Sequence, residues 1–160
     1  MARPQRHRRQ YRVREATPPR YASASPATAL TGVLLDSDVI IDVLRGRTDT
    51  VAELARLAAT GIRTYTCAVS VAEIFVGIRP GEETRTEAFF EARGDIAIDA
   101  ATGRRAGTYL ARHAGSHGLE IADALIAAAA TTAGLHLWTR NTRHYPMEGL
   151  RLHRPSPVTT

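Results

Sequence analysis

The chain has 160 residues and a formal net charge of +5 at pH 7, which suits one compact domain with tails and leaves little room for two domains. All 21 basic residues are arginine, and the absence of lysine excludes mechanisms that need one, such as a Schiff base or a phosphate-binding P-loop. The single cysteine, Cys67, excludes an internal disulfide, and no apolar run is long enough to span a membrane, so we expect a soluble, cytoplasmic protein.

Residues 1–30 differ in composition from the rest of the chain. They hold seven arginines and one acid, whereas residues 31–160 hold 14 arginines and 15 acids. A segment so rich in Arg, Pro and Ser buries too little apolar surface to offset its ordering entropy, so we expect a disordered N-terminal extension. It is interpreted either as an RNA-binding arm or as a dispensable tail, and the tail is the favoured interpretation.

Strand and helix patterns alternate from Thr31 onward. Short apolar or β-branched runs predict strands at residues 33–35, 62–67, 95–98 and 135–138. Apolar positions at helical spacing predict helices at residues 39–44, 49–59, 69–78, 82–93, 100–114 and 120–132. One further short strand is expected within residues 151–160. The alternation predicts an α/β fold with a parallel sheet and helices on both faces, in which ligands bind beyond the carboxyl ends of the strands.

Three acids stand where burial makes a charge costly. Asp36 follows the apolar run 33–35 directly, whereas Glu73 and Asp123 lie in helices whose other positions are mostly apolar. A buried carboxylate needs a cation or strong hydrogen-bond donors, so we expect Glu73 to be at least partly buried and paired. Taken singly, each acid has a plain alternative, because Asp36 could cap the next helix and the other two could pair with arginines.

Taken together, the three acids indicate a metal site. Each lies near the start of a helix that follows a strand or loop, so all three could converge at one edge of the sheet. Like charges in such proximity require a divalent cation among them. Oxygen ligands favour Mg²⁺, with Mn²⁺ as the alternative, and such clusters are typical of metal-assisted phosphate ester hydrolysis.

Four segments carry these residues in a fixed order: Leu34–Asp42, Val69–Ile74, Gly118–Ala128 and Thr139–Tyr145. In order and spacing they resemble the four motifs of PIN domains, particularly the VapC-type toxins of type II toxin–antitoxin systems. The resemblance covers about residues 32–150, and four ordered motifs make it specific.

The resemblance implies a three-layer α/β/α sandwich at residues 31–153, with a C-terminal tail at 154–160. It further implies a Mg²⁺-dependent endoribonuclease, the toxin of a VapBC-type pair, with RNA, a VapB-type antitoxin and a second copy of the chain as partners. Carried over residue by residue, Asp36, Glu73 and Asp123 would hold the metal, and Asn141 would complete the catalytic set.

The fourth motif departs from the family pattern at its end. His144 stands where the family has an acid, and Tyr145 replaces the usual Phe, which weakens a second metal position and makes a one-metal site plausible. Asp38 is interpreted as a helix cap or an outer support of the site, and Asp42 as a surface residue.

Arginines are the candidate contacts to RNA, because their planar fork suits phosphate oxygens. Arg140 and Arg143 flank Asn141 and are the better candidates. The weaker candidates are Arg45, Arg47, Arg104, Arg105 and Arg112. The apolar helices at 69–78 and 82–93 suit either core packing or the burial of a partner.

Three alternatives remain open. The spacing of Asp36 and Asp38 also resembles the nucleophile motif of haloacid-dehalogenase-type phosphatases, which normally need a downstream lysine that this chain lacks. A PIN-like RNA-binding module with a weakened site is the second alternative, suggested by His144. The third is zinc binding by His113 and His117, which is disfavoured because we expect glycines to interrupt their helix.

Overall fold

The computed structural model describes residues 31–156. The N-terminal extension predicted at residues 1–30 and the last four residues of the C-terminal tail lie outside the described residues, so these two assignments stay predictions.

The described chain alternates short strands with helices. The strands are β1 (Val33–Leu35), β2 (Thr64–Cys67), β3 (Gly94–Ile96), β4 (His136–Trp138) and β5 (Arg151–Leu152). The helices are α1 (Ser37–Leu44), α2 (Thr48–Ala59), α3 (Ala68–Val76), α4 (Glu83–Glu91), α5 (Ala100–His117) and α6 (Ile121–Ala133), with a 3₁₀ turn, η1, at Thr142–His144. The predicted strands and helices therefore exist, including the short C-terminal strand.

All five strands are parallel and lie in the order β3-β2-β1-β4-β5. The chain first extends the sheet from β1 to β2 and β3, then returns to the other side of β1 to add β4 and β5. Leu34 of β1 consequently pairs with Tyr65 on one side and with Leu137 on the other. The order of strands reverses between β1 and β4, and open α/β sheets bind ligands at such a switch point.

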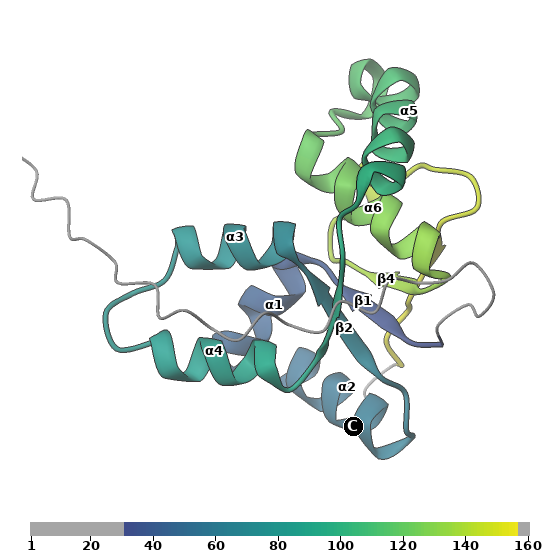
Figure 1. Ribbon diagram of the computed structural model, residues 1–160. Helices are drawn as coiled ribbons and strands as arrows, with labels where there is room; N and C mark the ends of the chain where they lie inside the picture. Colours follow the sequence, from purple (N-terminus) through teal and green to yellow (C-terminus); the bar gives the residue numbers. More distant parts are fainter. Residues whose placement is uncertain (1–30, 157–160) are drawn as a thin grey trace, which may run out of the picture.

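The two faces of the sheet bury two separate cores, because successive side chains of a strand point to opposite faces. Val33 and Leu35 pack with Trp138 against residues of α1, α2, α3 and α4. Leu34 and Leu137 pack instead against α5 and α6. Figure 1 shows the two helix groups on opposite sides of the sheet, which confirms the predicted α/β/α sandwich.

Helix α5 is longer than the sequence pattern predicts. The helix passes through Gly115 and ends at Gly118, which adopts the left-handed conformation (φ 64°) typical of helix C-termini. The expectation that Gly115 interrupts this helix is therefore wrong: an interior glycine costs only about 1 kcal/mol, and α5 packs along α6. None of the helices within residues 31–156 is long and apolar enough to cross a membrane.

Candidate active site

The predicted site residues cluster at the carboxyl edge of the sheet, around the switch point. Asp36 follows β1, Asn141 lies three residues after the end of β4, and α3 begins directly after β2 and brings Glu73 to the same edge. Asp123 comes from the first turn of α6. Carboxyl ends of parallel strands share one edge, which explains why residues so distant in sequence meet here.

Asp36 is buried and forms the N-cap of α1. The residue is 6% exposed, and its Oδ1 accepts a hydrogen bond from the backbone N–H of Ser37 at 2.8 Å. Burial, helped by the charge of Asp38, raises the pKa of Asp36 to about 6. Helix capping and a site role are thus compatible in one residue, because the cap uses only one carboxylate oxygen.

Tyr145 links Asp36 to Asp123. The buried hydroxyl of Tyr145 lies 2.8 Å from Oδ2 of Asp36 and 3.3 Å from Oδ1 of Asp123. Burial, together with the charge of Asp36, raises the pKa of this hydroxyl, so it stays protonated and donates its single proton to a carboxylate. The structure therefore brings two of the three predicted acids within hydrogen-bond distance of one hydroxyl group.

Glu73 lies beside these two acids but does not join them. The hydroxyl of Ser37 donates a hydrogen bond to Oε2 of Glu73, which places Glu73 next to the N-terminus of α1. The expectation that Glu73 is at least partly buried is wrong, since its side chain is exposed. The surrounding apolar residues misled the prediction because part of the α3 surface, including Ala72 and Val76, faces solvent rather than the core.

His144 occupies the position next to Asp123. Its Nδ1 lies 3.2 Å from Oδ2 of Asp123, and its side chain is 38% exposed. The residue that replaces the family's acid thus contacts a predicted metal ligand through a nitrogen atom.

Asp38 holds the loop that follows β4. Its Oδ2 accepts hydrogen bonds from the backbone N–H groups of Arg140 (2.9 Å) and Asn141 (3.2 Å) and from the hydroxyl of Thr139 (3.3 Å). These contacts agree with the outer supporting role, one of the two roles expected for Asp38, whereas the cap of α1 is Asp36.

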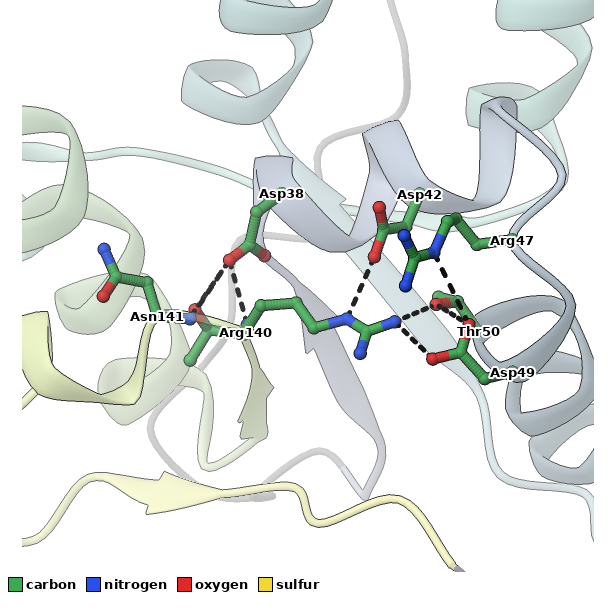
Figure 2. A network of polar contacts seen from close by, with 8 residues as sticks. Asp38, Asp42, Arg47, Asp49, Thr50, Arg140 and Asn141 are labelled. Atoms are coloured by element: carbon green, nitrogen blue, oxygen red, sulfur yellow. Dashed lines mark hydrogen bonds and ion pairs between the residues drawn. The ribbon is translucent and has the colours of Figure 1, made fainter. Parts of the chain in front are cut away.

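Arg140 is engaged by side chains of α1 and α2, as Figure 2 shows. Its guanidinium lies 2.9 Å from Asp42 and 2.7 Å from Asp49, and it donates a 2.6 Å hydrogen bond to the hydroxyl of Thr50. The interpretation of Asp42 as a plain surface residue is wrong, because its half-buried carboxylate pairs with Arg140.

The carboxylates at this edge fit a hard divalent cation that keeps much of its water. No three His, Cys, Asp or Glu side chains within the described part of the chain are arranged to hold a metal ion by themselves. Mg²⁺, however, commonly uses one or two carboxylates, several waters and a substrate phosphate, so Asp36 and Asp123 suffice. In addition, Oδ1 of Asp38 is buried and has no hydrogen-bond partner in the described chain. A buried carboxylate oxygen normally has a partner, so this oxygen is available to a hydrated cation.

Two features of the site escaped the sequence patterns. The hydroxyl of Tyr145 bridges two carboxylates, and its only sequence signal is a Tyr in place of the usual Phe. The pairing of Arg140 with Asp42 and Asp49 joins residues about a hundred positions apart, which no local pattern can reveal.

In a parallel α/β/α sandwich, acids at the switch point lie where a ligand binds, and such acids can hold a metal ion for phosphate ester hydrolysis. The family model for the PIN domain matches residues 33–150, so the chain belongs to the PIN-domain family. Ribonuclease VapC19 of Mycobacterium tuberculosis, in two strains, is 33% identical over 115 residues, which cover 71% of this chain and 92% of that protein.

Solved structures of toxin–antitoxin complexes have the same fold. The DNA-bound VapBC structure from Salmonella typhimurium superposes with a TM-score of 0.66 at 20% identity, over 78% of this chain and 98% of that chain. A toxin–antitoxin complex from Klebsiella pneumoniae gives a TM-score of 0.61 at 25% identity, over 74% and 95% of the two chains. The PIN-like fold expected from the four motifs is therefore confirmed.

Proposed function

We propose that this protein is a metal-dependent endoribonuclease that hydrolyses RNA phosphodiester bonds and acts as the toxin of a VapBC-type toxin–antitoxin pair. The observation that carries the proposal is the meeting of Asp36 and Asp123 at the Tyr145 hydroxyl, on the switch-point edge of a PIN domain. The 33% identity to a ribonuclease supports the activity. A cytoplasmic location is part of the same proposal, because that is where its RNA substrates would be.

The proposed cofactor is Mg²⁺, with Mn²⁺ as the alternative, because its ligands are carboxylate oxygens. Asp36 and Asp123 would hold the ion, Glu73 would hold one of its waters from the rim, and Asn141 would complete the set. A bound divalent cation supplies an activated water at neutral pH and neutralises charge on the phosphate.

The chain's own residues bind and orient the RNA around this site. Arg143 is exposed and forms no ion pair within residues 31–156, so its guanidinium is free for a phosphate oxygen. The imidazole of His144 is 38% exposed beside Asp123, so it can hydrogen-bond a phosphate or a ribose hydroxyl. The Tyr145 hydroxyl donates to Asp36 and thereby holds this carboxylate beside Asp123.

The proposed protein partners are a VapB-type antitoxin and a second copy of the chain. A pocket between α1, α3 and α4 has Glu73 in its wall together with apolar Ile41 and Ile74 and the basic residues Arg45 and Arg85, so it suits an antitoxin segment that carries both apolar and charged side chains. Measuring how strongly the antitoxin inhibits RNA cleavage tests this contact. We expect the antitoxin to inhibit the Ile41→Glu variant less strongly than the wild type.

The homodimer is proposed to form through the exposed surface of α3 around Val76, which is 90% exposed.

The activity is tested by incubating the protein with mixed transfer and ribosomal RNA in Mg²⁺. We expect internal cleavage that stops on chelation with EDTA and falls at least about a hundredfold in Asp36→Asn, because a carboxylate ligand of the ion is lost. Small phosphomonoesters serve as the control and should stay intact. Hydrolysis of the phosphomonoesters without RNA cleavage would favour the phosphatase alternative, and RNA binding without any cleavage would favour the weakened binding module.

A further inference from the structure

The segment that carries Asn141, His144 and Tyr145 is held to the rest of the domain at two points. The first is Oδ2 of Asp38, which accepts hydrogen bonds from the backbone N–H groups of Arg140 and Asn141. The second is the guanidinium of Arg140, which reaches across to α1 and α2. Figure 2 shows both contacts running outward from the loop after β4, whereas the carboxamide of Asn141 points away from them.

We propose that the contacts of Asp38 and Arg140 together fix the position of the fourth motif, Thr139–Tyr145, and we call this pair of residues the staple. Arg140 is then a positioning residue rather than an RNA contact. The inference rests on the proposed ribonuclease function. It changes the role of Arg140, which the sequence alone places beside Arg143 as a candidate for binding phosphate.

The charges around Arg140 argue against a phosphate contact. Its Nε pairs with Asp42, and its Nη2 serves both Asp49 and Thr50. The guanidinium is held between two carboxylates, and moving it to an RNA phosphate would leave Asp42 without its cation and Asp49 with only its 3.8 Å pair to Arg47. Arg143, three residues further along, is exposed and pairs with no carboxylate in the part of the chain that the structure describes.

The backbone contacts explain how the staple acts on the site. The amide of Asn141 is held at 3.2 Å by Asp38 and at 3.0 Å by the hydroxyl of Thr139. The turn η1 follows at once and delivers His144 and Tyr145 to Asp123 and Asp36. A shift of about 1 Å in catalytic groups can cost roughly a hundredfold in rate, so a loosened staple should slow the chemical step.

The matched variants are Arg140→Gln and Arg143→Gln, which make the same change three residues apart. The first measurement is anisotropy of a labelled mixed-sequence single-stranded oligoribonucleotide in EDTA, over a series of salt concentrations. Each phosphate contact contributes about 0.7 to the slope of log affinity against log salt. We expect Arg143→Gln to lower this slope by about 0.7 and Arg140→Gln to leave it unchanged.

The second measurement is the rate of cleavage at saturating RNA in Mg²⁺. Arg140→Gln should reduce this rate by roughly ten- to a hundredfold with an unchanged KM, whereas Arg143→Gln should raise KM. A fall in the salt slope for Arg140→Gln, with an unchanged saturating rate, would make Arg140 an RNA contact and overturn the proposal.

The third measurement needs no RNA and separates this inference from the proposed function. We expect hydrogen exchange of the Asn141 and Tyr145 amides to accelerate at least about tenfold in Arg140→Gln and in Asp38→Ala, and to stay unchanged in Arg143→Gln. Unchanged exchange in both staple variants would refute the staple, even if the wild-type protein cleaves RNA. Accelerated exchange in a protein that cleaves no RNA would leave the staple standing and refute the ribonuclease.

Discussion

The hydroxyl group of Tyr145 lies between two acids and donates its proton to the nearer one. A phenol has one proton, and the shorter distance shows that Asp36 receives it, while Asp123 lies just beyond. Without this donor, the buried Oδ2 of Asp36 would lose its 2.8 Å hydrogen bond. Removing the donor from a buried acceptor costs far more than a hydrogen bond contributes on balance.

Tyr145→Phe should therefore lower the free energy of unfolding of the metal-free protein by about 1–3 kcal/mol, because it takes a donor away from a buried carboxylate oxygen. Urea unfolding in EDTA at pH 7 measures the loss. The matched control is Tyr109→Phe, which removes only a 3.2 Å contact to the Thr131 hydroxyl and should cost less than about 1 kcal/mol. Equal losses in the two variants would contradict the role of Tyr145 as the donor to Asp36.

The residues of the site were predictable from sequence to different degrees. Asp36 was, because a carboxylate that directly ends a buried apolar run is costly unless a donor or a cation compensates it. The exposure of Glu73 was not predictable, because a helix that is apolar on every side has the same sequence pattern whether its outer surface packs in the core or is left open to a partner. The contacts of Arg140 depend on the spatial neighbours of β4, which only the sheet order reveals.

At the scale of elements, a second polar cluster ties the end of the domain to α2. Glu53 accepts hydrogen bonds from Arg56 at 2.8 and 2.7 Å, and its Oε1 lies 2.7 Å from Nε2 of His153. The ring of His153 also packs edge-on against Trp138. The cluster thus fixes the residue that follows the edge strand β5.

Glu53→Gln should destabilise the protein in a pH-dependent manner. The hydrogen bonds from Arg56, followed by those from His153, hold the pKa of Glu53 below its usual 4.5. A lowered pKa stabilises the folded state above the unfolded pKa of 4.5, and this stabilisation is lost as pH falls toward the folded pKa. We expect a loss of about 1–3 kcal/mol at pH 7 that shrinks below about pH 4.5.

Urea unfolding of wild type and Glu53→Gln at several pH values measures this dependence. Glu82→Gln is the control, since the contacts of this side chain are a 3.9 Å pair with Arg85 and a 3.1 Å hydrogen bond from the backbone N–H of Arg79, both at the surface, and exposed pairs contribute little. A stability difference for Glu53→Gln that stays constant from pH 7 to pH 4 would contradict the assignment.

The outer surface of α3 exposes apolar side chains. Ala68, Ala72 and Val76 are exposed at a spacing of four residues, so they form an apolar stripe along one side of the helix. Val76→Asp should therefore convert the proposed homodimer into a monomer without lowering thermal stability, measured by size exclusion with light scattering. Val51→Asp, on the exposed side of α2, should leave the dimer intact. A wild-type protein that is monomeric, or a Val76→Asp variant that stays dimeric, would refute this interface.

The elements themselves were predictable, and their ends less so. The strand expected at residues 62–67 begins at Thr64, because parallel pairing with β1 starts there. The turn η1 gave no pattern of its own, since it is three residues long and is defined by the loop that Asp38 holds. Periodicity thus predicts what an element is, and tertiary contacts decide where it ends.

For the molecule as a whole, the charge of the chain is a weaker guide to function than the placement of its acids. The net charge of +5 comes from residues 1–30, whereas residues 31–160 have 14 arginines and 15 acids. The alternation of strands and helices predicts a parallel sheet, and the sheet order then brings Asp36 and Asp123 together. The proposed nuclease activity therefore depends on the proximity of Asp36 and Asp123 rather than on an overall basic surface.

Binding of Mn²⁺ in the absence of RNA tests this proximity of Asp36 and Asp123 most directly. Titration followed by electron paramagnetic resonance should give one Mn²⁺ per chain for the wild type, and Asp36→Asn and Asp123→Asn should each lose at least roughly tenfold in affinity. Asp99→Asn, which alters an exposed helix-capping carboxylate of α5, should bind as the wild type does. Wild-type affinity in Asp123→Asn, or no binding by the wild type, would contradict a metal site built on these two acids.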